Sequence, residues 1–411
     1  MQDSKVVEIP SVQAFRRRLQ EEGPVFWVKE DRAMAIFDPD VAERVEAANY
    51  ADLTMLDGFS DIVRGRKSEP VSWHQVRGAW LGKMRVLSSV EGFKQLALRM
   101  QNLLDAEIGR DQDLVWLAER AMLEPLVSAI IAGLTPRAHR RVVDEVMSKV
   151  ALVLSDIDEH RCPPLHKPKM WVYQFLVGVE VRRELKGRAS GKRPRQEDLT
   201  DPMVDMLPEL GLDRAADAVT ALLTAITSSP GAGAACLLFE WQRQHEWRER
   251  MIAELSAIPL DALCESPARL APNTTRFVKE VLRIWSSPPI VTRSVRTDIC
   301  EGETQLKTGQ VYALSSFFTH HDASTWSDPD VFNPDRWLAE SREQCPHGSY
   351  VPFGWAPKSC IGANLGLGQL ILMAHLFSTR YRLRIADPQR AKMVVASVVR
   401  PMDFVGAVVR A

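Results

Sequence analysis

The chain reads Phe353-Gly-Trp-Ala-Pro-Lys-Ser-Cys360-Ile-Gly362 near its carboxyl end, and apolar residues such as Leu365 and Leu370 follow at helical spacing. This spacing predicts a helix that begins just after the cysteine. The N-terminus of a helix offers free backbone N–H groups and partial positive charge, and both stabilise a thiolate, the metal-binding form of cysteine. We therefore predict that Cys360 is a metal ligand and that Gly362 lets the backbone approach a flat cofactor closely.

The same segment resembles the haem-binding loop of the cytochromes P450, which reads F-G-x-G-x-R-x-C-x-G. The positions that match in register are Phe353, Gly354, Cys360 and Gly362. Ala356 replaces the second glycine, and Lys358 replaces an arginine that usually meets a haem propionate. The lysine keeps the positive charge but loses the planar fork of the guanidinium, and a plain surface lysine is the alternative for this position. The resemblance implies haem b as the cofactor, Cys360 as the iron ligand, and Phe353, Lys358 and Gly362 as further haem contacts.

Two further segments support the resemblance. Glu280-Val-Leu-Arg283 matches the family's E-x-x-R, and Phe332-Asn-Pro-Asp-Arg336 matches its later F-x-P-x-R. The spacing of three places the Glu280 carboxylate and the Arg283 guanidinium on one helix face. E-x-x-R alone occurs by chance in many helices, but its order and its distance from Cys360 make it specific. The resemblance implies that Glu280, Arg283 and Arg336 form a buried ion-pair network that supports the proximal side of the haem.

Haem propionates need partners that carry N–H groups, and four residues are candidates. Arg293 lies where members of the family commonly place a propionate-binding arginine. Trp73-His-Gln-Val-Arg77 fits the family's W-x-x-x-R pattern, and His74 stands alongside. Indole, imidazole and guanidinium groups can all donate hydrogen bonds to a carboxylate. We therefore expect Trp73, His74, Arg77 and Arg293 to bind the haem, with simple helix packing as the alternative for Trp73.

The family's oxygen-activation motif, A-G-x-[D/E]-T on the long central helix, is altered in this chain. Alignment from the downstream Arg243-Gln-His-Glu246 places the motif on Ala225-Ile-Thr-Ser228-Ser229. Ser229 then takes the place of the catalytic alcohol and Ser228 that of the acid, so the carboxylate is missing. A serine forms hydrogen bonds but is not an acid at neutral pH. A shifted alignment on Gly233-Ala-Ala-Cys236 is the alternative, and it would leave neither acid nor hydroxyl.

Pro230 follows this motif directly, with Gly231 and Gly233 behind it. A proline inside a helix removes one backbone hydrogen bond and clashes with the carbonyl four residues earlier, here that of Ile226, at a cost of about 3 kcal/mol. The two glycines add roughly 1 kcal/mol each relative to alanine. The sequence therefore predicts that the central helix kinks or opens beside the haem. Altered proton delivery and ordinary hydroxylation with protons from solvent both remain open.

The rest of the chain predicts a helical body with small sheets appended. Apolar residues recur at helical spacing over roughly 75–110, 113–133, 169–186 and 212–256. Thr135-Pro136 predicts an N-cap followed by proline at the first helical position. Short β-branched runs that predict strands lie at 290–292, 311–314 and 393–395. The basic stretch 186–195 predicts a solvated loop.

The fold class that the resemblance implies is mainly α with small β-sheets, the cytochrome P450 fold. In this fold the haem lies between the distal central helix and the loop and helix of the cysteine ligand. We expect residues 1–411 to form a single haem domain without a fused reductase.

The composition of the 411 residues excludes several classes of protein. Hydrophobic residues make up 45% and charged residues 26%, which argues against a disordered chain or a fibrous repeat. The net charge of −1 gives no global excess that would point to nucleic acid or an acidic membrane. No apolar signal core stands near the N-terminus, and the longest apolar stretch is about half of the ~20 residues that span a bilayer. We expect a cytoplasmic monomer that binds neither nucleic acid nor membrane.

These features predict a haem-thiolate monooxygenase that inserts oxygen into a C–H bond of a small organic substrate, expected to be a secondary metabolite. Its electrons would come from a separate ferredoxin and ferredoxin reductase. The predicted pocket walls are Ala225, Ile290 and Val291. One alternative is an atypical P450 that performs peroxide-driven oxidation, ring coupling, desaturation or dehydration, because the distal acid is replaced. A non-catalytic haem- or ligand-binding protein is the other.

Overall fold

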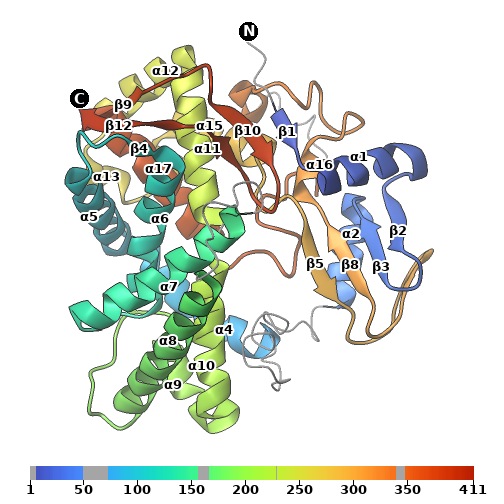
Figure 1. Cartoon of the computed structure of the whole chain (residues 1–411), viewed down its shortest axis with the longest axis horizontal. Helices are drawn as coiled ribbons and strands as arrows, with labels where there is room; N and C mark the ends of the chain where they lie inside the picture. The colour runs from blue at the N-terminus through green and yellow to red at the C-terminus, as the bar shows by residue number, and fades with distance from the viewer. Residues whose placement is uncertain (1–5, 50–72, 156–165, 228, 339–347) are drawn as a thin grey trace.

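The computed structural model describes residues 6–49, 73–155, 166–227, 229–338 and 348–411, apart from the side chains of residues 73–75 and 167. Helices predominate in this part of the chain, and its strands form four small sheets (Figure 1). The fold class predicted from the sequence, mainly helical with small sheets, is confirmed.

The helices and strands follow one another along the chain with these bounds. The helices are α1 (Pro10–Glu22), α2 (Pro39–Ala48), α4 (Trp73–Leu87), α5 (Val90–Ala106), α6 (Leu114–Ile130), α7 (Pro136–Leu154), α8 (His166–Ala189), α9 (Asp201–Asp205), α10 (Leu207–Ala225), α11 (Ser229–Arg243), α12 (His245–Ser256), α13 (Leu260–Leu263), α14 (Pro267–Leu270), α15 (Pro272–Ile284), α16 (Ser316–His320) and α17 (Ala363–Thr379), with a 3-10 turn at Pro334–Trp337. The strands are β1 (Val6–Glu8), β2 (Val25–Lys29), β3 (Ala33–Ile36), β4 (Gln112–Asp113), β5 (Val291–Ser294), β6 (Ile299–Glu301), β7 (Thr304–Leu306), β8 (Val311–Leu314), β9 (Tyr381–Ile385), β10 (Lys392–Val395), β11 (Val399–Met402) and β12 (Val405–Arg410).

Several helices begin at side chains that satisfy their first free N–H groups. The Thr135 hydroxyl accepts from the Ala138 N–H, and Pro136 occupies the first position of α7, as the sequence predicts. Asp113 caps α6 in the same way by accepting from the backbone N–H groups of Val115 and Trp116. Each cap of this kind stabilises a helix by about 1 kcal/mol.

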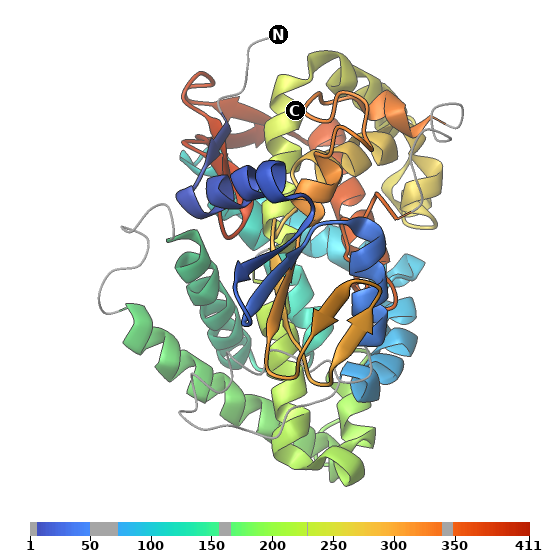
Figure 2. The ribbon, with the colours of Figure 1, turned by 90° about the vertical axis from the view of Figure 1, so that its right-hand side faces the viewer.

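One four-stranded sheet lies beside the helical body, with the order β2-β3-β8-β5. Figure 2 views the molecule from the side of this sheet, in front of the helices. β3 and β8 are parallel, whereas β2–β3 and β5–β8 are antiparallel pairs. β5 brings Arg293 into register with Tyr312 of β8. The sheet therefore holds Arg293 on a rigid strand rather than on a loop.

The basic stretch 186–195 is a solvated loop, as the sequence predicts, only from residue 190 onward, and its first part is helical. α8 continues to its fourth residue, and the Arg188 side chain is fully buried in an ion pair with Asp198, with both guanidinium–carboxylate contacts at 2.8 Å. Arg193 pairs with the buried carboxylate of Glu184. The prediction failed for this first part because the neutralising carboxylates stand outside the basic stretch, Glu184 two residues before it and Asp198 three residues after it.

The central helix is interrupted, as the sequence predicts for the region around Pro230. α10 ends at Ala225 and α11 begins at Ser229, so the two run one after the other through the middle of the molecule (Figure 1). Pro230 is the second residue of α11, a position whose N–H would have no helical partner. The proline therefore opens a new helix instead of straining a continuous one.

The segment Leu207–Arg243 is long and apolar enough to cross a membrane, judged by length and composition alone. However, 71% of its apolar 18-residue stretch is buried inside the protein. It reads as the core of the helical body, because α6 and α17 both pack against α11.

Candidate haem site

A cavity separates the distal helices α10 and α11 from the loop that carries Cys360. Its empty volume, including the open mouth, is about 1470 Å³. Its walls are apolar, with Met122 and Leu126 from α6, Leu222 from α10 and Leu370 from α17. No Asp or Glu stands among the lining residues within the described ranges. The cavity is suited to an apolar ligand held by a few polar groups.

The cysteine loop is folded tightly onto itself. The Cys360 N–H donates to the Phe353 carbonyl at 2.8 Å, and the Gly354 N–H donates to the Val351 carbonyl at 3.0 Å. Gly354 adopts a φ of +80°, a left-handed conformation that glycine adopts without a steric penalty. Gly362 is the N-cap of α17, and a Cβ at this position would lie 3.7 Å from the Cys360 sulfur. The loop thus presents the sulfur at the start of a helix, as the sequence predicts.

The Cys360 thiol opens onto the cavity but is otherwise surrounded by protein. Burial raises the pKa of the thiol, and the Gly362 N–H and the positive charge of Arg77 only partly oppose this rise. The helix N-terminus alone therefore does not make Cys360 a thiolate. A cysteine that coordinates a metal cation is deprotonated by it, so the thiolate and a bound metal belong together.

Three cationic side chains gather beside the cysteine loop. Arg77 Nη1 donates to the Ser359 carbonyl at 2.8 Å, and Arg293 lines the cavity with its Nε 3.5 Å from Glu46 Oε1. The pKa of Lys358 falls to about 7 because the group is buried and lies near the positive charges of Arg293 and Arg77, which outweigh Glu46. A negatively charged ligand at this position would relieve the repulsion among the three cations.

Two buried N–H groups at the cavity fit the same kind of ligand. Arg293 Nε and Trp355 Nε1 donate no hydrogen bond within the described part of the chain, and both residues line the cavity. A buried donor without an acceptor costs roughly 1–3 kcal/mol, so a carboxylate ligand would stabilise the site. No sequence motif pointed to Trp355, although a tryptophan inside the loop pattern was a signal that could have identified it. These residues fit the iron and propionates of haem b.

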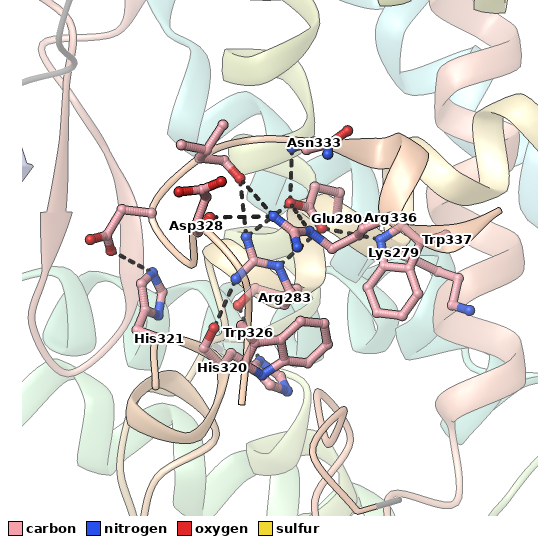
Figure 3. Close-up of polar contacts among 12 residues, drawn as sticks. Lys279, Glu280, Arg283, His320, His321, Trp326, Asp328, Asn333, Arg336 and Trp337 are labelled. Atoms are coloured by element: carbon pink, nitrogen blue, oxygen red, sulfur yellow. Dashed lines mark hydrogen bonds and ion pairs between the residues drawn. The ribbon is translucent and has the colours of Figure 1, made fainter. Parts of the chain in front are cut away.

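The Glu280 carboxylate forms the centre of a buried network on the proximal side of the cavity (Figure 3). Arg283 donates to both carboxylate oxygens, at 2.8 and 3.0 Å, and Arg336 Nε donates to Oε1 at 3.0 Å. The Asn333 N–H adds a third bond to Oε1, and the Trp337 indole adds a second to Oε2. Glu280, Arg283 and Arg336 therefore meet as the resemblance implies, and Trp337, which follows Arg336 directly, completes the group.

His320 connects this network to the cysteine loop, and no sequence motif pointed to it. Its carbonyl accepts from Arg283 Nη1 at 2.8 Å, and its Nε2 accepts from the Val351 N–H at 2.8 Å. Its Nδ1 lies 2.6 Å from the Ser286 hydroxyl and donates to it, because Nε2 is the acceptor nitrogen. Burial and the Arg283 charge hold the pKa of His320 well below its usual value, so the ring is neutral.

The remaining predicted residues divide into three groups. Ala225, Val291 and Ser229 line the cavity. Ile290 was predicted to be a pocket wall and is not among the lining residues, because its side chain packs against the main core. Ser228 and the side chains of Trp73 and His74 lie outside the described residues.

The shifted alignment of the oxygen-activation motif places little at the cavity. Gly233 lines it, whereas Ala234, Ala235 and Cys236 do not. Cys236 is fully buried, and its thiol donates to the Val399 carbonyl at 3.5 Å. The first alignment, which places Ser229 at the cavity, agrees better with the geometry.

A metal at this site would find one protein ligand in Cys360. The described residues contain no group of three His, Cys, Asp or Glu side chains that could hold a metal ion. An iron carried by an organic cofactor, with Cys360 as the single protein ligand, fits this arrangement.

Comparison with known families matches the part of the chain that contains most of this site. A sequence model described as Cytochrome P450 matches residues 194–402, half of the chain. The matched region contains the Glu280 network, Arg293 and the cysteine loop.

Curated relatives match over shorter regions. Cytochrome P450 4A10 of Mus musculus is 28% identical over 198 residues, which are 48% of this chain and 36% of that protein. Putative cytochrome P450 132 of Mycobacterium tuberculosis is 30% identical over 138 residues, 33% of this chain and 30% of that protein. The matched region thus spans about a third of the length of these relatives.

Solved structures match over nearly the whole chain. The heme domain of cytochrome P450DA has a TM-score of 0.74 at 19% identity, with 98% of this chain and 92% of that chain covered. The retinoic acid-bound cyanobacterial CYP120A1 has a TM-score of 0.77 at 17% identity, covering 98% and 95%. At these identities the likeness shows the fold.

Proposed function

This chain belongs to the cytochrome P450 family, and from that membership we propose that it is a haem-thiolate monooxygenase acting on a small apolar organic substrate. The observation that carries the proposal is the position of Cys360. Its sulfur opens onto an apolar cavity, beside a cluster of cations and opposite an interrupted helix.

Haem b would be held by residues of α4, the cysteine loop and β5. Cys360 would be the iron ligand, Arg77, Arg293 and Lys358 would meet the propionates, and the Trp355 indole would add a further N–H. Once bound, haem b supplies the activation of dioxygen that the protein's own side chains cannot perform. The Glu280 network and His320 fix the backbone that presents Cys360, since the Val351 N–H lies in the same loop.

The side chains on the distal side hold the substrate and exclude water. Leu222, Ala225, Val291 and Leu126 provide apolar walls, so the substrate is bound by burial of its apolar surface. Ser229, at the start of α11, places a hydroxyl at the cavity. This hydroxyl can accept and donate hydrogen bonds, and can therefore pass a proton without being its source.

The substrate class is a small organic molecule such as a secondary metabolite, and the apolar walls support this choice. The electrons come from a separate ferredoxin and its reductase, and the protein works as a cytoplasmic monomer in one haem domain. The ordinary soluble composition and the net charge of −1 support this part of the proposal.

Peroxide-driven oxidation is a second candidate, favoured by one observation. No carboxylate lines the described part of the cavity. Hydrogen peroxide brings both the oxygen atom and the two electrons, so that a C–H bond and one peroxide give an alcohol and water without added protons. Turnover with peroxide alone would support this reaction, and turnover only with ferredoxin and reductase would exclude it.

A ligand screen on the haem-loaded protein tests the proposal. Apolar secondary metabolites and long-chain carboxylic acids are screened by the change in haem absorbance on binding, and bound compounds are incubated with ferredoxin, reductase and dioxygen. We expect an oxygenated product that contains one atom of labelled dioxygen. A protein that takes up haem and binds compounds, but yields no product with ferredoxin and reductase or with hydrogen peroxide, would contradict the proposal.

A further inference from the structure

A buried carboxylate lies behind the cavity wall at the point where the central helix is interrupted. Glu119 belongs to α6, which packs along α11, and its side chain has 0% exposure. A Cβ on Gly231 would lie 1.8 Å from Glu119 Oε2 and 2.3 Å from its Cδ. The carboxylate therefore occupies the space that a side chain at position 231 would need, in the first turn of α11.

The first turn of α11 reaches the cavity, and so does the face of α6 that carries Glu119. Ser229 and Pro230, the residues just before Gly231, line it. Met122 and Leu126, one and two turns beyond Glu119 on α6, line it as well. The Glu119 carboxylate thus lies behind the cavity wall, against Gly231, which is two residues from Ser229 in the first turn of α11.

The distal side otherwise lacks an acid in the part of the cavity that the structure describes. Ser228 stands where the family places its acid, and a serine does not release a proton at neutral pH. A carboxyl group can both release and regain one.

We propose that Glu119 is the proton source of the distal site, a positioning residue that acts through the Ser229 hydroxyl from a helix other than the one that carries the hydroxyl. The inference rests on the proposed monooxygenase function. In that reaction a C–H bond, dioxygen, two electrons and two protons give C–OH and water. Glu119 releases each proton towards Ser229, directly or through a water molecule, and regains one from solvent, so it ends each turnover unchanged.

A purely structural role is the competing explanation. A carboxylate at a helix N-terminus stabilises that helix, and Glu119 would then only fix the start of α11. Glu119→Gln separates the two roles because glutamine has the same shape and accepts hydrogen bonds but cannot release a proton at neutral pH. Glu119→Asp keeps the acid and shortens the side chain by one methylene.

Glu240→Gln is the matched control. Glu240 is a second buried carboxylate, farther along α11, whose oxygens accept from Trp285 and Gln244. It does not line the cavity. If activity falls only because a buried carboxylate has been removed, both glutamine variants should lose activity. If Glu119 is the proton source, Glu119→Gln alone should lose activity.

The first measurement needs no substrate. Infrared difference spectra of the reduced, carbon monoxide-bound protein are recorded across photolysis in H₂O and D₂O. We expect a carboxyl band that responds to photolysis, shifts in D₂O, disappears in Glu119→Gln and persists in Glu240→Gln. A band that persists in Glu119→Gln, or the absence of any responsive carboxyl band, would overturn the proposal.

The second measurement uses a substrate from the screen. With haem content and substrate affinity unchanged, Glu119→Gln should form product roughly 10²-fold more slowly, in line with the loss of a general acid. It should release hydrogen peroxide instead and show an altered solvent isotope effect, and Glu119→Asp should recover part of the rate. If Glu119→Gln does not fold, Glu119→Asp alone decides, and a wild-type rate and isotope effect in it would overturn the proposal. Absence of turnover in the wild-type protein would instead count against the proposed function itself.

Discussion

The two sides of the cavity are built in different ways. On the proximal side, the oxygens of one carboxylate, Glu280, accept five hydrogen bonds from four residues, and His320 ties this network to the cysteine loop. On the distal side the helix is interrupted between Ala225 and Ser229, and the start of α11 packs closely against Glu119. The proximal side is fixed by hydrogen bonds and ion pairs, whereas the distal side is shaped by the interruption between α10 and α11 and by side-chain packing.

The difference teaches where rigidity is needed in this site. A cysteine ligand must be presented in one geometry, and a fully satisfied buried network specifies one arrangement. A substrate and small molecules must enter and leave the distal side, where one helix ends at Ala225 and the next begins at Ser229. Four changes to the chain test this comparison, beginning with the largest expected effect.

Removal of the proximal carboxylate should cost the most. Glu280→Gln leaves the buried guanidinium groups of Arg283 and Arg336 without their counter-charge, and breaking a buried pair in this way costs about 3–5 kcal/mol. Urea denaturation of the haem-loaded protein should show this loss. Glu249→Gln, on an exposed carboxylate, should stay within about 0.5 kcal/mol. Equal effects of the two substitutions would mean that the proximal network is not a rigid frame.

Filling the space at Gly231 should have the next largest effect. Gly231→Ala forces its methyl group against the Glu119 carboxylate, and overpacking of this kind costs up to about 3 kcal/mol. Gly233→Ala is the control, because its nearest neighbours, Leu282 and Leu370, would lie at ordinary contact distances of 3.8 and 3.9 Å. Gly233→Ala should raise the free energy of unfolding by up to about 1 kcal/mol, because alanine has the higher helix propensity. Two substitutions with similar unfolding free energies would contradict the close packing of α6 on α11.

Acid should weaken the proximal side through His320. Its folded-state pKa lies well below the usual 6.5, so the unfolded chain binds the extra proton and stability falls as the pH drops below about 6.5. The contribution is about 1.4 kcal/mol for each pH unit until the folded-state pKa is reached. His320→Gln cannot titrate and should reduce the slope of the unfolding free energy between pH 6.5 and 5, while His321, whose pKa burial lowers to about 3, keeps its own contribution. An unchanged slope in this variant would show that His320 is not buried as a neutral ring.

Removal of the proline should have the smallest effect. Pro230 stands in the first turn of α11, where no backbone N–H is required, so Pro230→Ala should change the unfolding free energy by less than about 1 kcal/mol. A stabilisation of about 3 kcal/mol would show that the proline strains a continuous helix instead. Far-ultraviolet circular dichroism alongside the denaturation curve would detect helix gained across the interruption.

The sequence predicted those parts of the site that depend on short local patterns. The cysteine loop, the i,i+3 pair of Glu280 and Arg283, and the interruption at Pro230 each follow from residues close together in the chain. His320, Trp355 and Glu119 were missed because their roles come from tertiary contacts, Glu119 meeting Gly231 across more than a hundred residues. Arg188 was misread for a related reason, because Asp198 neutralises it from beyond the basic stretch.

The central claim is that Cys360 is the thiolate ligand of a haem. The most direct measurement is the absorbance spectrum of the reduced, carbon monoxide-bound protein, compared among wild type, Cys360→Ala and Cys300→Ala. Cys300 is an exposed cysteine on β6 away from the cavity and serves as the control. The account predicts the band characteristic of thiolate-ligated haem in wild type and Cys300→Ala, and its loss in Cys360→Ala. The same band in Cys360→Ala, or no such band in wild type, would contradict it.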